Sequence, residues 1–125
     1  MTDAWSNLAR GRYLNLESFR RDGTGVRTPL WFAADGTTLF VYSRADAGKI
    51  KRLRRDPACR IAACDMKGNL SGPWLNAQSR LLTGTEAAAA MRLLDQKYWP
   101  WKQLLGLLAK FRPGTRTVVA LTPAP

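Results

Sequence analysis

Short segments that alternate between apolar and polar residues make up most of the chain. Two Asp-Gly pairs, at residues 22–23 and 35–36, interrupt this alternation early in the sequence and predict tight hairpin turns. Strands joined by short turns pair with their neighbours, so the pattern indicates an antiparallel sheet closed into a small barrel. Six strands are predicted, over residues 13–19, 26–33, 37–43, 60–65, 74–82 and 115–121.

Two or three helices are expected at the edge of this barrel. Residues 3–11 predict a short helix that ends at Gly11. A basic helix is predicted from Asp46, its expected N-cap, to Arg55, where Asp56-Pro57 ends it. Ile50 and Leu53 lie three residues apart and give this helix a narrow apolar face.

A third helix is predicted near the C-terminal end, with Thr85 as its N-cap and its last turn at about Trp99. Pro100 suits the first turn of a further helix, which Pro113-Gly114 would stop. Apolar side chains line one side of that helix, at Trp101, Leu104, Leu105, Leu108 and Phe111. The aromatic cluster around Trp99 and Trp101 is expected to pack in the core or in a dimer interface, or to roof a substrate pocket.

The length of 125 residues corresponds to a single domain, residues 1–125, and the 46% of hydrophobic residues is enough for one core. No apolar run reaches the roughly 18 residues that a membrane helix needs. The first eight residues are polar and contain no apolar signal core. We therefore expect a cytoplasmic protein that does not enter a membrane.

The chain carries 20 Lys and Arg against 9 Asp and Glu, a formal charge of +11. Such a surplus indicates an anionic partner, which could be nucleic acid, an anionic membrane surface or a small polyanion. An Arg-rich codon usage would give the same surplus without any partner.

The absence of His excludes Ser-His-Asp and Cys-His catalysis as well as imidazole metal sites. The two cysteines, Cys59 and Cys64, are five residues apart, and in an extended strand this odd separation points them to opposite faces. This spacing disfavours a disulfide and a shared metal ion. Both are expected to be small core residues in a reducing compartment, and no metal site is predicted.

The junction between the third strand and the basic helix has the groups that bind a phosphate. Ser43 supplies a hydroxyl at the strand end, the helix N-terminus supplies backbone N–H groups, and Lys49 in the first turn supplies a cation. Four further cations follow at positions 51, 52, 54 and 55. Taken alone, this run is also compatible with a basic helix that only faces solvent.

The order of several segments resembles the pyridoxamine-phosphate-oxidase-like superfamily, and within it the F420-dependent oxidoreductases of actinobacteria. The resemblance spans about residues 8–121 and rests on the order and spacing of three segments rather than on one specific motif. These are Tyr13-Leu14-Asn15-Leu16 through Thr28-Pro29-Leu30-Trp31-Phe32, Val41-Tyr42-Ser43 through Asp56-Pro57, and Gly72-Pro73-Trp74. The resemblance implies a mainly β fold, a six-stranded antiparallel split β-barrel with two or three peripheral helices.

The resemblance also implies the positions of a cofactor site. Ser43 and Lys49 match the phosphate ligands of the family, with Lys51 and Arg52 as helpers. The segment Thr28, Pro29, Leu30 and Trp31 would run along the ring system through backbone contacts. The sites of the family lie at a homodimer interface, where Trp74 would face the cofactor of the partner or pack as a buried aromatic.

Coenzyme F420 is the expected cofactor, with flavin mononucleotide (FMN) as the alternative and a tetrapyrrole-like or lipid ligand less favoured. FMN has one phosphate, whereas F420 has a phosphodiester and a glutamate tail that suit the basic helix better. The expected activity is hydride transfer between F420 and an unknown small organic substrate, with no catalytic residue assigned. Tyr98 and a route through bulk water are both open as the proton source.

Other functions stay open at this point. The protein could carry the cofactor without catalysing a reaction, or it could be a basic β-barrel that binds nucleic acid, although it lacks the paired strand aromatics of such modules. Gly48 stands where pyridoxamine-phosphate oxidases proper carry an Arg before the phosphate-binding Lys. Together with the lack of His, this departure argues against oxidation of pyridoxamine phosphate.

Overall fold

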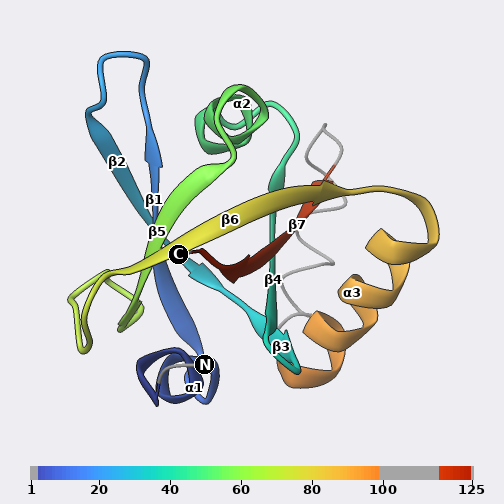
Figure 1. Cartoon of the computed structure of the whole chain (residues 1–125). Helices are drawn as coiled ribbons and strands as arrows, with labels where there is room; N and C mark the ends of the chain where they lie inside the picture. Colours follow the sequence, from blue (N-terminus) through green and yellow to red (C-terminus); the bar gives the residue numbers. More distant parts are fainter. Residues whose placement is uncertain (1–2, 99–115, 125) are drawn as a thin grey trace.

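Seven β-strands and three α-helices are present in residues 3–98 and 116–124, the part of the chain that the computed structural model describes (Figure 1). In chain order the elements are α1 (Asp3–Ala9), β1 (Tyr13–Phe19), β2 (Gly25–Trp31), β3 (Ala33–Asp35), β4 (Thr38–Arg44), α2 (Gly48–Arg55), β5 (Ala58–Cys64), β6 (Leu75–Leu82), α3 (Gly84–Tyr98) and β7 (Arg116–Pro123).

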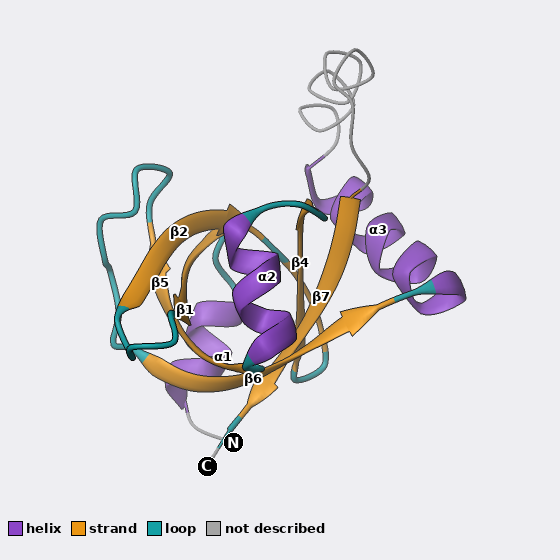
Figure 2. Cartoon of the chain, turned by 90° about the horizontal axis from the view of Figure 1, so that it is seen from above, coloured by secondary structure: helices purple, strands orange, loops and turns teal. Residues whose placement is uncertain are grey.

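The strands form one antiparallel sheet in the order β2-β1-β5-β6-β7-β4-β3. Strands β2 and β3 lie at the two ends of this order, yet a single residue, Phe32, joins them. The two edges of the sheet must therefore come close to each other, which requires the sheet to curl (Figure 2). The strand pairing does not close the ring, so the sheet is a curled, open one.

The prediction of six strands is wrong by one, because residues 26–33 are two strands and not one. Trp31 pairs with Tyr13 of β1, whereas Ala33 pairs with Phe40 of β4. The chain changes partner at Phe32, whose side chain is fully buried. The apolar pattern continues across this point, so it gives no local sign of the break. The other five predicted strands are confirmed, with ends shifted by two residues or fewer.

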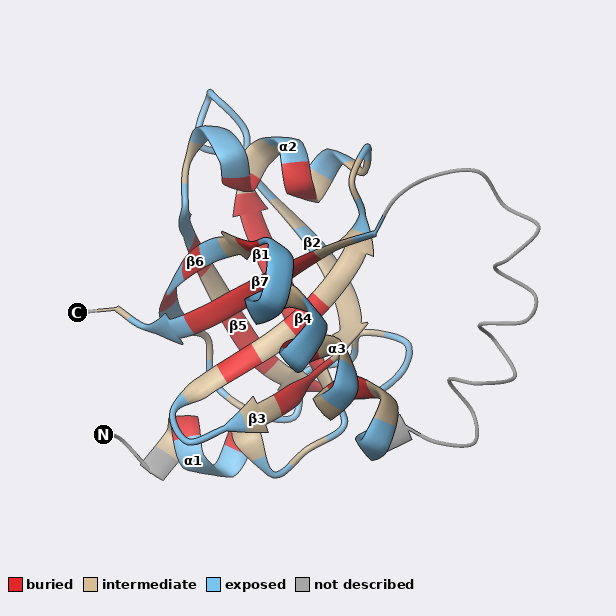
Figure 3. Cartoon of the chain, turned by 90° about the vertical axis from the view of Figure 1, so that its right-hand side faces the viewer, coloured by how far each residue is buried: buried red, intermediate tan, exposed pale blue. Residues whose placement is uncertain are grey.

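The main core lies inside the curled sheet and is closed by one helix at each end (Figures 1 and 3). Trp5 and Leu8 of α1 and Ile50 and Leu53 of α2 all join it. The strands contribute the alternate side chains that face inward, Leu14, Leu16, Leu39, Val41, Ile61, Val119 and Leu121 among them. The alternation predicted for the chain is thus the alternation of a half-buried sheet.

Helix α3 packs on the outer face of the sheet. Its residues Ala90 and Leu94 are buried against β3, β4 and β7. Phe40 and Tyr42, predicted on the opposite face of the strand from Leu39 and Val41, take part in these outer clusters. The sheet is therefore covered on both sides at this edge, and β4 is fixed by packing on both of its faces.

The predicted helix caps are wrong. Helix α2 is preceded by Ala47, which makes no side-chain capping hydrogen bond, while the carboxylate of Asp46 accepts hydrogen bonds from Arg44 at 3.1 and 3.0 Å. The carboxylate that was expected to cap the helix is thus bound by the guanidinium of Arg44, at the end of β4. Thr85 lies inside α3, because that helix begins at Gly84. The first helix ends at Ala9 rather than at Gly11.

The predicted helix from Pro100, with Trp99 and Trp101, lies outside the described residues, as does the side chain of Tyr98. None of the helices in residues 3–98 is long and apolar enough to span a membrane.

Candidate functional site

A groove with a volume of about 360 Å³ lies between the first two strands and β4. Strand β2 contributes Pro29, Leu30 and Trp31 to its lining, so three of the four residues predicted to run along a cofactor ring lie together there. Tyr13, Tyr42 and Met66 complete the described lining. An aromatic and apolar groove of this size suits a flat ring system.

Tyr13 and Trp31 face each other because β1 and β2 pair in this register. Their ring centroids are 6.4 Å apart at an interplanar angle of 52°, a tilted arrangement that is favourable for two aromatic rings. Thr28, the fourth predicted ring-contact residue, is half-buried and does not line the groove. Thr28 is thus the one member of the predicted segment that lies outside the groove.

The two predicted phosphate ligands lie in contact. Lys49 in the first turn of α2 donates a hydrogen bond from its Nζ to the Oγ of Ser43 at the end of β4, at 3.1 Å. Both side chains are half-buried. The first turn of α2 contains no acidic residue, and Ala47 provides no cap. The helix N-terminus therefore keeps its partial positive charge beside the ammonium group, which favours an anion there.

Lys49 has no acidic partner among the residues that the structure describes. Burial, and then the positive charge of Arg52, lower the pKa of Lys49 below its ordinary value. No ion pair joins Lys49 or Arg52 to an acidic group within the described part of the chain. A half-buried cation without a counter-charge is unfavourable, and a bound anion would relieve this cost.

Arg52 reaches back across the first turn of α2. Its Nε donates a hydrogen bond of 2.7 Å to the Oγ of Ser18, a buried residue of β1. A Cβ atom at Gly48 would lie 2.9 Å from Nη1 of Arg52, so a side chain at position 48 would displace this guanidinium. The Arg52 guanidinium thus occupies the space that a side chain at position 48 would need. Lys51, the other predicted helper, is exposed.

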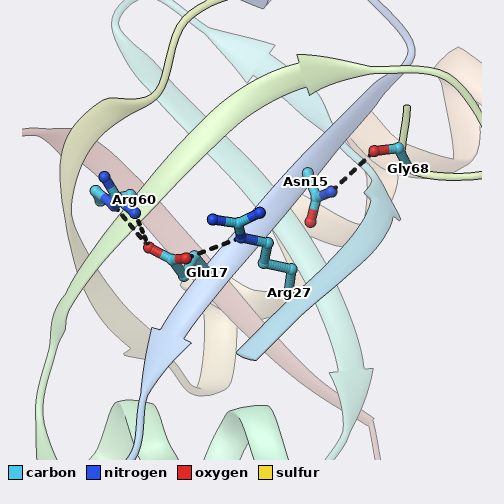
Figure 4. A network of polar contacts seen from close by, with 5 residues as sticks. All are labelled: Asn15, Glu17, Arg27, Arg60 and Gly68. Carbon is cyan, nitrogen blue, oxygen red and sulfur yellow. Dashed lines mark hydrogen bonds and ion pairs between the residues drawn. The ribbon is translucent and has the colours of Figure 1, made fainter. Parts of the chain in front are cut away.

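A second polar cluster lies on the outer face of β1 and was not predicted (Figure 4). Glu17 is only 3% exposed and accepts hydrogen bonds from the Nε atoms of Arg27 on β2, at 2.9 Å, and Arg60 on β5, at 2.6 Å. The two guanidinium carbons lie 4.8 and 5.2 Å from the ring centroid of Trp74. Trp74 is therefore held by two cations and does not line the groove of its own chain.

Asn15 lies next to this cluster, toward the groove. Its Nδ2 donates a hydrogen bond of 3.1 Å to the carbonyl of Gly68, which ties the segment between β5 and β6 to β1 (Figure 4). Gly68 has a φ of +92°, a backbone conformation that favours glycine. Met66, which lines the groove, belongs to the same turn, so this hydrogen bond helps to fix one wall of the groove.

Sequence reasoning missed Tyr13, Tyr42 and Met66 as groove residues and Glu17 as the centre of the outer cluster. The alternation of β4 puts Tyr42 opposite the core residues Leu39 and Val41, a signal that could have marked it. Burial raises the pKa of the Tyr42 phenol, so it keeps its proton at neutral pH. No comparable sequence pattern indicated that Glu17 pairs with Arg27 and Arg60.

The two cysteines are free and buried, as predicted, and face opposite sides of β5. Cys59 joins the main core, whereas Cys64 lines a second hollow that is described below. Burial, and then the charge of Asp56, raise the pKa of Cys59 to about 12. No cluster that could hold a metal ion is present in the described residues.

Solved structures with the same fold include cofactor-binding proteins. The chain superposes on an F420 reductase with a TM-score of 0.63 and 20% identity over 100% of this chain and 96% of that one. A putative pyridoxamine 5'-phosphate oxidase from Listeria innocua gives 0.61 and 16%, over 96% and 90%. The heme storage protein HutZ from Vibrio cholerae gives 0.69 and 12%, over 96% and 87%.

No protein-family profile matches the sequence, and the comparison with curated protein sequences found no match. The likeness to solved structures therefore establishes the fold alone. That fold is the one of the pyridoxamine-phosphate-oxidase-like split-barrel proteins, as the sequence resemblance predicted. Proteins with this fold include oxidoreductases and a heme storage protein, so the fold does not decide the activity.

Replacing Glu17 by Gln is expected to lower the free energy of unfolding at neutral pH by about 1–3 kcal/mol, because two charge-assisted hydrogen bonds become neutral ones. Burial alone raises the pKa of Glu17, but Arg27 and Arg60 more than offset this and hold it below 4.5. The ionised Glu17 carboxylate thus stabilises the fold fully above the pKa that Glu17 has in the unfolded chain. This stabilisation is lost as the pH falls through the lower pKa that Glu17 has in the folded protein.

Urea unfolding of the wild type and Glu17→Gln at neutral pH and in acid measures this difference, which should shrink in acid. Glu86→Gln, which breaks the exposed pair with Arg80, is the control and should change stability little at either pH. If the loss of unfolding free energy in Glu17→Gln stays constant with pH, the charge of the Glu17 carboxylate does not stabilise the fold.

Proposed function

We propose that this protein is an oxidoreductase that binds a flavin-type cofactor, with coenzyme F420 preferred over FMN. The cofactor phosphate would bind at Ser43 and Lys49, and its ring system would lie in the groove along Pro29, Leu30 and Trp31. The protein would act in the cytoplasm as a homodimer with the sites at the interface.

The observation that carries this proposal is the pairing of Lys49 with Ser43. It places a half-buried cation without an acidic partner, a hydroxyl and an uncapped helix N-terminus at one point. These groups fit a phosphate, which offers several acceptor oxygens and the missing negative charge. A merely solvated basic helix would not need Lys49 to be half-buried.

The groove supports the position of the ring. Tyr42, which lines the groove, directly precedes Ser43 on β4. The described lining contains no charged side chain, so it suits the uncharged part of a cofactor better than its phosphate. One ligand with an apolar ring and an anionic end matches both places.

The basic surface supports F420 over FMN. Lys51, Arg54 and Arg55 are exposed on α2 beyond the phosphate site. The turn between β1 and β2 adds Arg20 and Arg21, and this turn lies close to α2 because Arg55 Nη2 donates a hydrogen bond to the carbonyl of Phe19. A glutamate tail would meet these cations, whereas FMN has no group to reach them.

When bound, reduced F420 or FMN supplies a hydride for an organic acceptor. The residues of this chain would bind and orient it: Lys49 and Ser43 at the phosphate, and the aromatic groove at the ring. The Tyr42 phenol holds a proton in the groove, since burial raises its pKa. We assign no residue to proton transfer.

Two exposed apolar side chains support a dimer. Met66 is 67% and Leu70 is 46% exposed, and both belong to the segment between β5 and β6 that borders the groove. A second copy covering this segment would bury them and would add residues to each groove.

A cofactor carrier without catalysis is the rival within the same site. Heme storage is the reported role of one protein with this fold, but the present chain has no His to serve as an axial ligand. A turnover assay distinguishes an oxidoreductase from a carrier, since a carrier would bind reduced F420 without accelerating its oxidation by any organic acceptor.

Lys49→Ala is expected to weaken cofactor binding about ten- to a hundredfold, because a charge-assisted hydrogen bond contributes about 1.5–3 kcal/mol. The fold should be retained, since the ammonium group only contacts a hydroxyl at the surface of the core. Fluorescence titration with F420 and with FMN measures the effect. Arg54→Ala is the control, as Arg54 is an exposed cation of the same helix. Equal small losses for both variants would contradict the phosphate site.

F420 is expected to bind more tightly than FMN at low salt, and this preference should shrink as salt rises. Exposed charges are screened within about 8 Å at physiological ionic strength, so the contribution of the tail should fall while that of the half-buried Lys49 persists. Titrations of both cofactors at two salt concentrations test this. Equal affinities at low salt would contradict the assignment of F420.

The protein is expected to be a dimer in solution, with roughly twice the 13.9 kDa mass of the chain in light scattering. Replacing the exposed Met66 and Leu70 by Ser should shift it toward the monomer and weaken cofactor binding at the same time, because each site then loses the partner. A monomeric wild type at micromolar concentration would remove the shared-site arrangement.

A further inference from the structure

A second hollow, with a volume of about 440 Å³, lies between α1 and the segment that precedes β6. It is larger and more enclosed than the cofactor groove. Its walls come from Leu8 of α1, Tyr13 of β1, Cys64 of β5 and Pro73. Hollows of this size are where proteins hold small molecules.

The described lining of this hollow contains no charged side chain. This is notable in a chain with 29 charged residues among 125, 20 of them Lys or Arg. One cation lies behind the lining, Lys97, but its Nζ is engaged by the fold: it donates a hydrogen bond of 2.6 Å to the carbonyl of Gly11 and lies 4.0 Å from the ring centroid of Phe32. An occupant with a net charge would lose hydration without compensation, so the lining favours an uncharged molecule.

Three polar groups in the lining make no hydrogen bond within the described part of the chain: the amide of Asn7 and the hydroxyl of Ser71, both on exposed residues, and the hydroxyl of Tyr13. Together they offer donors and acceptors in an otherwise apolar hollow. A few such groups in a mostly apolar hollow are typical of a site that fixes the orientation of a neutral organic ligand.

Two glycines of the lining, Gly72 and Gly11, lie close to neighbouring groups. A Cβ atom at Gly72 would lie 3.4 Å from the Cβ of Ala63, and one at Gly11 would lie 3.3 Å from the carbonyl of Leu8. The backbone N–H of Ser71 donates a hydrogen bond of 2.8 Å to the carbonyl of Ala63, which fixes the outer wall to β5. The hollow is thus held by backbone contacts.

We propose that this second hollow binds a small, uncharged and largely apolar organic molecule, with Asn7, Tyr13 and Ser71 as its polar contacts. The inference does not depend on the proposed cofactor. Tyr13 also lines the cofactor groove, so an occupant would lie against a side chain that both sites share.

The test is equilibrium dialysis of the cofactor-free protein against 2-naphthol and against 2-naphthoate, which have the same rings but differ in charge at neutral pH. We expect saturable binding of 2-naphthol that salt does not weaken. Any binding of 2-naphthoate should come from the basic surface and should fall as salt rises. Binding of both compounds at one salt-sensitive site, or no binding of 2-naphthol, would overturn the proposal.

Ser71→Phe and Asn7→Phe fill the hollow from two exposed positions on different elements, so at least one should leave the fold intact. Each is expected to weaken 2-naphthol binding about tenfold or more. Thr85→Phe, an exposed position of α3 outside both hollows, should have no effect. If Trp31→Ala weakens binding and the two filling variants do not, 2-naphthol occupies the cofactor groove and the proposal is wrong.

Discussion

The change of partner strand at Phe32 is the constraint on which the candidate site depends. Because β2 and β3 are the two edge strands of the sheet and only one residue separates them, the sheet has to curl until its edges come close, although the ring stays open. This curl brings Pro29–Trp31 of β2 next to Tyr42 of β4, although the two strands are not paired. The full burial of Phe32 anchors the junction in the interior, where its exposure would be costly.

Helix α2 connects this fold to the chemistry of the site. Ile50 and Leu53 are buried in the core, so the helix has one fixed rotation at the end of the barrel. That rotation directs Lys49 and Arg52 toward Ser43 and Ser18 and leaves Lys51, Arg54 and Arg55 in solvent. The cations of one helix thus divide into a half-buried pair suited to a single phosphate and an exposed set suited to a longer anion.

The charge surplus of the chain has more than one role. Arg27 and Arg60 both pair with Glu17 and contact Trp74, so they contribute to the fold although their side chains are partly exposed. Among the described residues, Lys51, Arg54 and Arg55 of α2 are exposed cations without an ion pair, while the described linings of both hollows are uncharged. This separation allows an anionic end, an apolar ring and a neutral molecule to bind at different places on one small domain.

The sequence by itself determined the features that depend on near neighbours: five of the strands, the two Asp-Gly hairpins, the basic helix with its buried Ile50 and Leu53, and the Ser43–Lys49 pair, whose members are six residues apart. Alternation and turn chemistry are local, so the chain alone can show them. Only the tertiary structure decided the break at Phe32, the groove walls at Tyr13 and Met66, and the pairing of Glu17 with Arg60, 43 residues away. These depend on which strands pair and in which register, and many pairings satisfy the same local pattern until the whole core is packed.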